Sequence, residues 1–150
     1  MTRIVLDTNI FIAALLRPDK SSRLVLRQVL DGKHQGLMGD VLFYEYESVL
    51  SRKELFAQCP ISPKEREELF NAFVACCEWV KIYYKWRPNL RDEGDNHLIE
   101  LAIAGGATTI ITKNVRDLKS GELYFKGLGI LTPEEFLREK GHGNHYLTIT

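Results

Sequence analysis

Several features that mark other protein classes are missing from this chain of 150 residues. Lysine plus arginine and aspartate plus glutamate number 20 each, so the chain has no overall basic field. Any contact with nucleic acid must therefore come from a local patch. The apolar runs are too short to span a membrane, and the first residues lack the charged-then-apolar layout of a signal peptide. We expect a protein without membrane segments.

Cysteine is also scarce, with three residues at Cys59, Cys76 and Cys77. The number is odd and two of the three are adjacent, which is poor geometry for a disulfide. No cysteine or histidine lies at the spacing of a zinc site. We expect a cytoplasmic protein with reduced thiols, in which Cys76 and Cys77 pack on the helix that precedes Trp79.

The composition is that of a globular domain, with 45% hydrophobic and 27% charged residues. A chain of this length can bury a proper core, and no repeat, low-complexity stretch or long linker divides it. We expect a single domain over residues 1–140 and a C-terminal tail over residues 141–150.

Strand-like and helix-like segments alternate along the chain. The pattern predicts strands at 3–6, 35–39, 78–83, 108–112 and 128–131. It predicts helices at 9–16, from a cap at Ser21-Ser22 to 31, at 40–52, 62–77 and 95–104, and after Thr132-Pro133. Such alternation indicates an α/β fold, a three-layer α/β/α sandwich with a mainly parallel central sheet of four to five strands.

The stretch Ile4-Val5-Leu6-Asp7-Thr8-Asn9 contains the first candidate site residues. A short buried strand runs into an acid, a hydroxyl and an amide, after which a helix begins. Ligands bind at the carboxyl ends of strands in an open α/β sheet. A carboxylate fixed there loses solvation unless something pairs with it, and a hard cation is one such partner. The simpler alternative is that Asp7 only caps the following helix.

Further acids fall near the same edge of the predicted sheet. Glu45 lies in the first turns of the helix 40–52, whereas Glu47 projects differently and is expected in solvent. The apolar side of that helix is formed by Val41, Leu42, Tyr46, Val49 and Leu50. Asp95 starts the helix 95–104, where capping is again the alternative. Asn114 and Asp117 follow the strand 108–112.

Crowded carboxylates repel one another unless a cation neutralises them. Ligands that offer oxygen atoms alone select magnesium or manganese over zinc. Such ions activate water and stabilise the leaving oxygen in phosphodiester cleavage. The sequence therefore predicts a site for Mg²⁺ or Mn²⁺ that is formed by Asp7, Glu45, Asp95 and either Asn114 or Asp117.

Positive charge lies beside these acids at Lys113, Arg116 and Lys119. This pattern suits a polyanion such as RNA, although a solvated loop would look the same. His97 could serve as a base, but a single histidine beside an acidic turn is more often a surface residue or one that supports a ligand.

These segments resemble the PIN domain family, a small nuclease fold found in the toxin half of many prokaryotic toxin–antitoxin pairs. Five ordered motifs between about residues 3 and 138 carry the resemblance: 4–9, the helix glutamate Glu45, 95–102, 112–118 and 129–137. The likeness is greatest to the toxin components of type II systems, which are described as VapC-like.

The resemblance implies that Asp7, Glu45 and Asp95 are catalytic metal ligands. It places supporting residues around them at Asn9, Asn96, Thr112 and Asn114. Many relatives carry aspartate at the position of Asn114, so either Asp117 acts as the fourth acid or the fourth ligand is weaker. We take Asp117 as the fourth catalytic and metal-binding residue, with Lys113 and Arg116 as substrate-binding residues.

The resemblance further implies a homodimer and an antitoxin protein whose tail occupies the acidic groove. Aromatic residues beyond those that a sheet core needs are expected to contribute to a partner surface: Tyr44, Tyr46, Tyr83 and Tyr84.

The leading functional hypothesis is a ribonuclease that depends on Mg²⁺ or Mn²⁺ and acts as a toxin. One alternative is a housekeeping nuclease that processes RNA without an antitoxin. Another is a degenerate domain that binds RNA or a protein partner without cutting. Phosphatases and flap nucleases use the same metal chemistry, so the fold alone does not choose among them.

Overall fold

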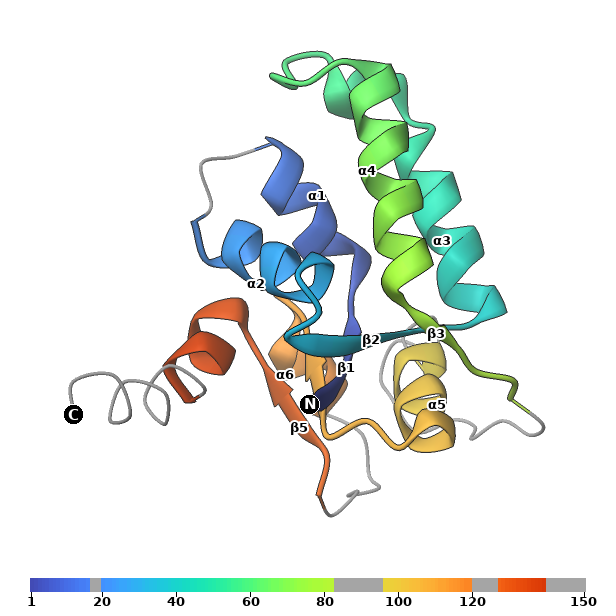
Figure 1. Cartoon of the computed structure of the whole chain (residues 1–150), viewed down its shortest axis with the longest axis vertical. Helices are drawn as coiled ribbons and strands as arrows, with labels where there is room; N and C mark the ends of the chain where they lie inside the picture. The colour runs from blue at the N-terminus through green and yellow to red at the C-terminus, as the bar shows by residue number, and fades with distance from the viewer. Residues whose placement is uncertain (17–19, 83–95, 120–126, 140–150) are drawn as a thin grey trace.

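The computed structural model describes residues 1–16, 20–82, 96–119 and 127–139 (Figure 1). The described strands are β1 (Thr2–Leu6), β2 (His34–Met38), β3 (Glu78–Trp79), β4 (Thr109–Ile111) and β5 (Gly129–Leu131). The described helices are α1 (Thr8–Leu16), α2 (Lys20–Leu30), α3 (Asp40–Leu50), α4 (Pro63–Cys76), α5 (Asn96–Gly105) and α6 (Val115–Lys119). A 3-10 turn, η1 (Lys53–Phe56), follows α3, and residues 133–139 are helical. The predicted tail at 141–150 lies outside the described residues.

The five strands form one parallel sheet in the order β3-β2-β1-β4-β5, which confirms the predicted α/β fold. From β1 the chain first builds outward through β2 to β3, and it then returns to the other side of β1 to add β4 and β5. This reversal places a topological switch point between β1 and β4. A crevice forms at the carboxyl ends of the strands at such a point.

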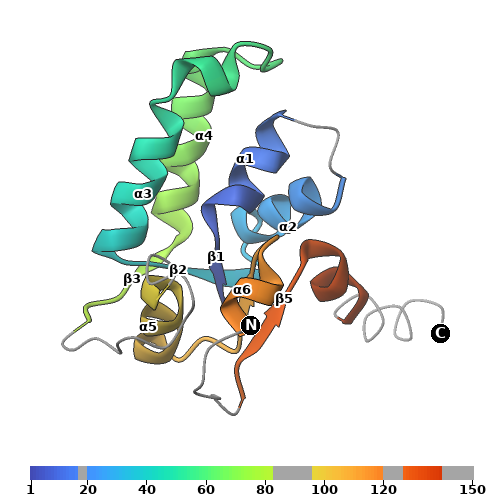
Figure 2. The same cartoon turned by 180° about the vertical axis from the view of Figure 1, so that it is seen from behind.

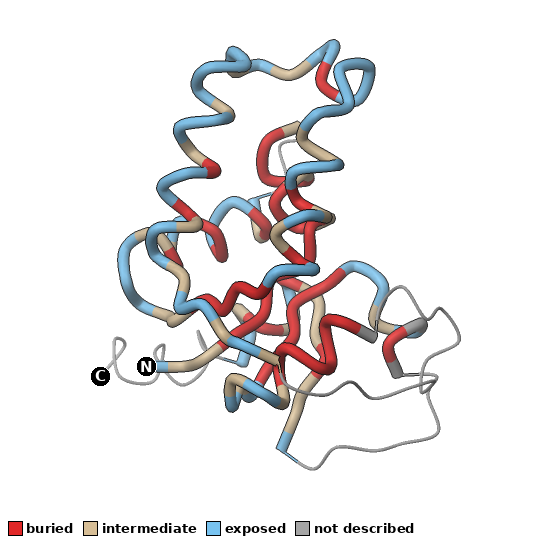
Figure 3. The backbone as a smooth tube through the Cα atoms, turned by 90° about the vertical axis from the view of Figure 1, so that its right-hand side faces the viewer, coloured by how far each residue is buried: buried red, intermediate tan, exposed pale blue. Residues whose placement is uncertain are grey.

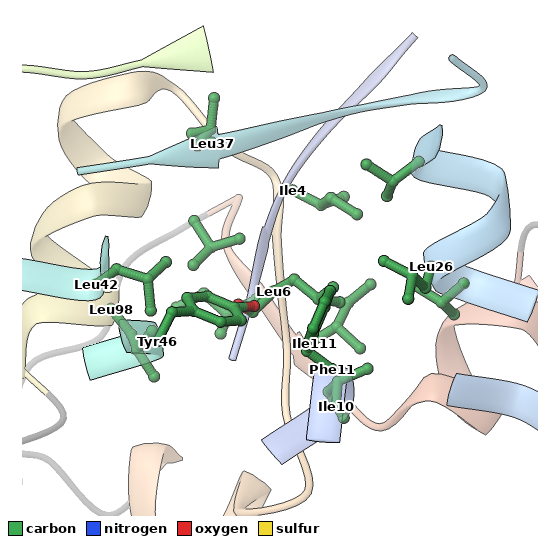
Figure 4. Packing of buried hydrophobic residues seen from close by; sticks show 14 of the residues in the cluster. Ile4, Leu6, Ile10, Phe11, Leu26, Leu37, Leu42, Tyr46, Leu98 and Ile111 are labelled. Atoms are coloured by element: carbon green, nitrogen blue, oxygen red, sulfur yellow. The ribbon is translucent and has the colours of Figure 1, made fainter. Parts of the chain in front are cut away.

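Helices cover both faces of the sheet. Figure 4 shows β1 with α2 to one side and α5 to the other. Helix α5 contacts β1, β2 and β4, whereas α2 and α4 both contact β2. Helices α3 and α4 form a hairpin that extends beyond the sheet, as the two opposite views in Figures 1 and 2 show. The arrangement is the expected α/β/α sandwich, with the hairpin added at one end.

The buried residues concentrate in the strands and in the helices packed on them (Figure 3). On one side of β1, Leu42 and Tyr46 of α3 gather with Leu98 of α5 (Figure 4). Leu42 and Leu98 are each 1% exposed or less, so α3 and α5 are held against each other by a dry contact. The residues next to these in sequence, among them Glu45 and His97, are thereby brought to one place.

Two helices begin at a capping box, and the cap at Thr132 was predicted. Ser62 caps α4 with a capping box, since its Oγ accepts from the Glu65 amide at 3.1 Å and its own amide donates to Glu65 Oε1 at 2.9 Å. Thr132 and Glu135 make the same exchange before the helical residues 133–139. The predicted cap at Ser21-Ser22 is wrong, because both residues lie inside α2, and Ser22 is fully buried there.

Two glycines lie at the end of α5 and have different roles there. Gly106 has φ +68°, a left-handed conformation that glycine adopts without steric cost. Gly105 lies close to β2, where an added Cβ would stand 2.5 Å from Leu37 Cδ1. A side chain at position 105 would therefore push α5 away from the sheet.

The edge strand departs most from the sequence prediction. Strand β3 covers only Glu78 and Trp79, and both are exposed, whereas a strand over 78–83 was expected. The chain continues beside β2 for one further residue, where the Val80 amide donates to Met38 O at 2.8 Å. Arg3 holds this edge in place from β1, through two bonds of 2.9 and 2.8 Å to the Glu78 carboxylate.

Two residues expected to be buried, Val41 and Cys76, are exposed. Val41 is 43% exposed, although the helical spacing assigned it to the buried side of α3. Cys76 is exposed at the end of α4, so of the adjacent pair it is the partly buried Cys77 that packs against the core.

None of the described helices is long and apolar enough to cross a membrane.

Candidate functional site

Asp7 stands at the carboxyl end of β1, immediately before α1, and is 4% exposed. In the β1–β4 register Leu6 pairs with Ile111, so the next residues on the two strands, Asp7 and Thr112, lie side by side. The Thr112 hydroxyl donates to Asp7 Oδ2 at 2.7 Å. Asp7 also precedes α1, at its cap position. Its shortest side-chain hydrogen bond, however, is the one from Thr112, at the end of the neighbouring strand.

Thr112 organises the end of β4 through its hydroxyl. The side chain is fully buried, and its Oγ1 accepts from the Asn114 amide at 3.0 Å while donating to Asp7. Asn9 approaches both groups, with Nδ2 3.4 Å from Asp7 Oδ2 and 3.5 Å from Thr112 Oγ1. Asn9 Oδ1 accepts from the Lys113 amide at 3.3 Å. These contacts orient the Asp7 carboxylate from two segments of the chain.

Glu45 reaches the same edge from α3. Its Oε1 accepts from the Thr8 hydroxyl at 3.2 Å, and that hydroxyl also lies 3.4 Å from Asp7 Oδ1. One hydroxyl therefore bridges the two carboxylates. The other oxygen of Glu45, Oε2, lies 3.0 Å from His97 Nε2 on α5. Tyr46, the next residue on α3, donates to Leu6 O at 2.7 Å and so ties this helix to the end of β1 (Figure 4).

The two carboxyl groups differ in their electrostatic surroundings. Burial raises the pKa of Asp7 above its ordinary value, partly offset by the bond from Thr112, and the negative charge of Glu45 raises it further. The hydrogen bond with His97 lowers the pKa of Glu45, against a smaller effect of its own burial. Asp7 is thus a carboxylate whose ionised form lacks sufficient compensation from the described residues, and a cation beside it would supply that compensation.

The structure leaves part of the predicted site outside its description. Asp95 and the side chains of Asn96, Asp117 and Lys119 do not belong to the described part. Within the described residues no three His, Cys, Asp or Glu side chains form a group that could hold a metal ion. The arrangement of Asp7 and Glu45 therefore needs further ligands to complete a metal site.

The remaining predicted site residues lie in the exposed segment that follows β4. Lys113, Asn114 and Arg116 are exposed, just after the end of β4, and α6 begins at Val115. Asp117 is in the middle of α6, three residues beyond Asn114. The Leu118 amide donates to Asn114 O at 3.3 Å, so a helical turn does start at Asn114.

Two site residues were missed or undervalued by the sequence reasoning. Thr8 was not assigned a role, although it stands between Asp7 and Asn9, and its hydroxyl contacts both carboxylates. His97 was left between a surface position and a supporting one. It is 8% exposed and contacts Glu45, which agrees with the supporting position. The contacts of Thr8 and His97 with Glu45 join residues far apart in the sequence, and helical spacing carries no signal for them.

The four tyrosines expected at a partner surface do not all lie there. Tyr44 is 67% exposed on α3, as a partner surface would require. The inclusion of Tyr46 among such residues is wrong, because its ring is fully buried among Phe11, Phe70 and Phe73. Tyr83 and Tyr84 lie outside the described residues.

Comparisons with known proteins agree with this architecture. Protein MJ1680 of Methanocaldococcus jannaschii, which is uncharacterized, is 29% identical over 150 residues that cover 91% of this chain and 90% of that protein. A crystal structure of VapBC2 from Rickettsia felis, bound to a DNA fragment from their promoter, contains a chain with a TM-score of 0.57. That match covers 86% of this chain and 97% of the other at 15% identity, and so bears on the fold alone.

A family model settles the membership. The model described as PIN domain matches residues 3–116, from the start of β1 into α6. This range includes the described residues Asp7, Thr8, Glu45 and Thr112. The chain belongs to the PIN domain family.

Proposed function

We propose that this chain is a nuclease that depends on Mg²⁺ or Mn²⁺ and cleaves the phosphodiester bonds of RNA. The observation that carries the proposal is the buried Asp7 carboxylate at the switch point of the sheet, joined to Glu45 by the Thr8 hydroxyl. PIN domains are in general nucleases, and membership of the family supports the same conclusion.

The donor set fits a hard divalent cation. The side chains that meet at this edge offer carboxylate and hydroxyl oxygens, and a buried carboxylate with a raised pKa gains from a nearby positive charge. We assign Asp7, Glu45, Asp95 and Asp117 as the residues that would hold the ion. When bound, it would activate water and stabilise the leaving oxygen of the phosphodiester.

The chain's own residues prepare this centre. Thr112 and Asn9 orient Asp7 through bonds of 2.7 and 3.4 Å, which limits the rotation of its carboxylate. The exposed Lys113 and Arg116 flank the same edge and would bind phosphate groups on either side of the cleaved bond. Because the chain has no net charge, these two side chains would supply the local positive patch that RNA requires.

We further propose that the nuclease is the toxin of a toxin–antitoxin pair, active as a homodimer and blocked by an antitoxin protein. The resemblance of its motifs to VapC-like toxins and the likeness of its fold to a chain of VapBC2 support this role. The exposed Tyr44 and Val41 on α3 are available for a partner. A small neighbouring gene whose product co-purifies and inhibits cleavage would support the toxin role; without one, a housekeeping nuclease becomes the better hypothesis.

The fourth acidic position is assigned to Asp117 rather than to Asn114. An amide oxygen can bind magnesium but cannot neutralise it, and Asp117 lies one helical turn beyond Asn114. Titration of Mg²⁺ against cleavage rate for Asp117→Asn and Asn114→Ala tests the assignment. We expect Asp117→Asn to require more Mg²⁺. If Asn114→Ala alone does so, the assignment is reversed.

The function itself is tested by cleavage of a defined RNA panel with magnesium, manganese or excess chelator. We expect the wild type to cut with either metal, and neither the chelated wild type nor Asp7→Asn to cut. Asp7→Asn should remain folded by circular dichroism, because Asn keeps the shape of the side chain. Full cleavage by Asp7→Asn or in chelator would refute the metal-dependent mechanism, and RNA binding without cleavage would favour a degenerate binding domain.

A further inference from the structure

His97 is the residue near the site whose place the nuclease proposal leaves unexplained. It lies in the first turn of α5 and is 8% exposed, so its ring is largely removed from water. Its Nε2 stands 3.0 Å from Glu45 Oε2, within hydrogen-bond distance. Its Nδ1 is buried with no hydrogen-bond partner among the described residues. Burying a polar ring costs free energy unless it is hydrogen-bonded, and the hydrogen bond that the described residues offer His97 is the one with Glu45.

The contact with Glu45 completes a clamp on that carboxylate. The Thr8 hydroxyl, from α1, holds Oε1 at 3.2 Å, and the His97 ring, from α5, holds Oε2. Glu45 itself comes from α3, and its side chain is 35% exposed, so without such contacts it could move into solvent. A glutamate has three rotatable side-chain bonds, and fixing them beforehand removes an entropy cost from metal binding.

The surroundings of the two ring nitrogens of His97 indicate which tautomer the neutral ring adopts. A neutral ring that donates from Nε2 to Glu45 leaves at Nδ1 a bare lone pair, which needs no acceptor. The opposite tautomer would place two acceptors face to face and bury an N–H for which no described residue is an acceptor. The geometry therefore favours a ring that acts as a hydrogen-bond donor to Glu45.

We propose that His97 is a positioning residue, which donates from Nε2 to Glu45 and holds this carboxylate in the orientation that binds the divalent ion. It acts through Glu45 and does not contact the substrate. The inference rests on the proposed function, since it assumes that Glu45 is a metal ligand. Partners that orient metal ligands in this way typically affect metal affinity about 10- to 100-fold.

The test compares two substitutions of His97 that place a nitrogen donor at different depths. Gln can extend an amide toward the position of Nε2, whereas the shorter Asn places its amide near the position of Nδ1. Manganese affinity is measured on the full chain by isothermal titration calorimetry, and folding by thermal unfolding. His34→Asn is the control, because His34 is a partly buried histidine at the start of β2 whose ring bonds to Gln28 at 2.8 Å, at the other end of the strands.

We expect His97→Asn to weaken manganese binding about 10- to 100-fold, and His97→Gln and His34→Asn to stay within about threefold of wild type. Equal affinities for His97→Asn and His97→Gln would overturn the positioning role, as would loss of the folded state in both, which would make His97 a core residue. If the wild type itself binds no manganese, the proposed function fails together with the inference. A wild type that binds manganese while the two His97 variants behave alike refutes the inference alone.

Discussion

Replacing Thr112 with valine tests the hydrogen bonding that holds Asp7. The two side chains have similar shapes, so Thr112→Val removes the hydroxyl from a fully buried position without opening a large cavity. It deletes the 2.7 Å bond to Asp7 and the acceptor for the Asn114 amide. Because Asn114 is exposed, water can take over its amide, and the loss is dominated by Asp7.

A hydrogen bond to a charged group contributes about 1.5–3 kcal/mol, and we expect Thr112→Val to lower the free energy of unfolding by about 2–3 kcal/mol. For a domain of this size, each kcal/mol shifts the melting temperature by about 2–4 °C, which gives a fall of roughly 4–12 °C. The bond from Thr112 also lowers the pKa of Asp7, so its loss raises that pKa further. A carboxyl group whose pKa is raised by folding makes the folded protein less stable as the pH rises. We therefore expect Thr112→Val to lower the free energy of unfolding more at pH 7 than near pH 4.

The assay is urea denaturation followed by circular dichroism, in chelator, at both pH values. Thr109→Val is the matched control, since Thr109 is a buried threonine, 7% exposed, at the start of β4, the strand that Thr112 follows. Its hydroxyl lies 3.5 Å from that of Thr108, at the outer limit of a hydrogen bond, and we expect a loss below about 1 kcal/mol. A Thr112→Val protein as stable as the control at pH 7 would refute the account of Asp7.

Three further predictions concern neighbouring groups. Tyr46→Phe should lower the free energy of unfolding by about 1–3 kcal/mol in urea denaturation, because it leaves the Leu6 carbonyl without its 2.7 Å donor; an unchanged midpoint would contradict this. Burial and the adjacent Cys76 raise the pKa of Cys77 to about 12, so a maleimide at pH 8 should label the exposed Cys76 first, as peptide mapping by mass spectrometry can check. Asp7→Asn should be more stable than wild type at pH 7 in chelator, because the raised pKa of Asp7 destabilises the folded wild type at pH values above 3.8, the ordinary pKa of the group. The difference in unfolding free energy between the two proteins should disappear as the pH falls to 3.8.

Much of the fold follows from local patterns in the sequence. Strands β1 and β4 contain short apolar and β-branched runs, and their alternation with helices predicts that the strands are parallel. The carboxyl-edge position of Asp7 follows from the same pattern, because a polar residue directly after a buried strand has to lie there. The helix starts at Ser62 and Thr132 were predictable because capping depends on residues three positions apart.

The features that the sequence did not predict depend on long-range packing. Strand β3 lies at the edge of the sheet and pairs with β2 alone among the described strands, so residues 80–82 have pairing on one side only and do not continue the strand. Val41 satisfies the helical spacing, but it lies in the first turn of α3 and is 43% exposed, beside a hollow that Val80 and Ile82 also line. The contacts of Thr8 and His97 with Glu45 require three helices to meet, which spacing within one helix cannot reveal.

The central claim is that Asp7 and Glu45 form a nuclease centre that depends on a divalent metal. Its most direct test is manganese-dependent RNA cleavage by Glu45→Gln and by Glu47→Gln, an exposed acid two residues further along the same helix. We predict that the cleavage rate of Glu45→Gln is roughly 100-fold or more below that of wild type, because losing a metal ligand should cost more than the about 10- to 100-fold that follows from losing a residue that orients one. Glu47→Gln should cleave like wild type. Equal rates for the two variants would contradict the claim.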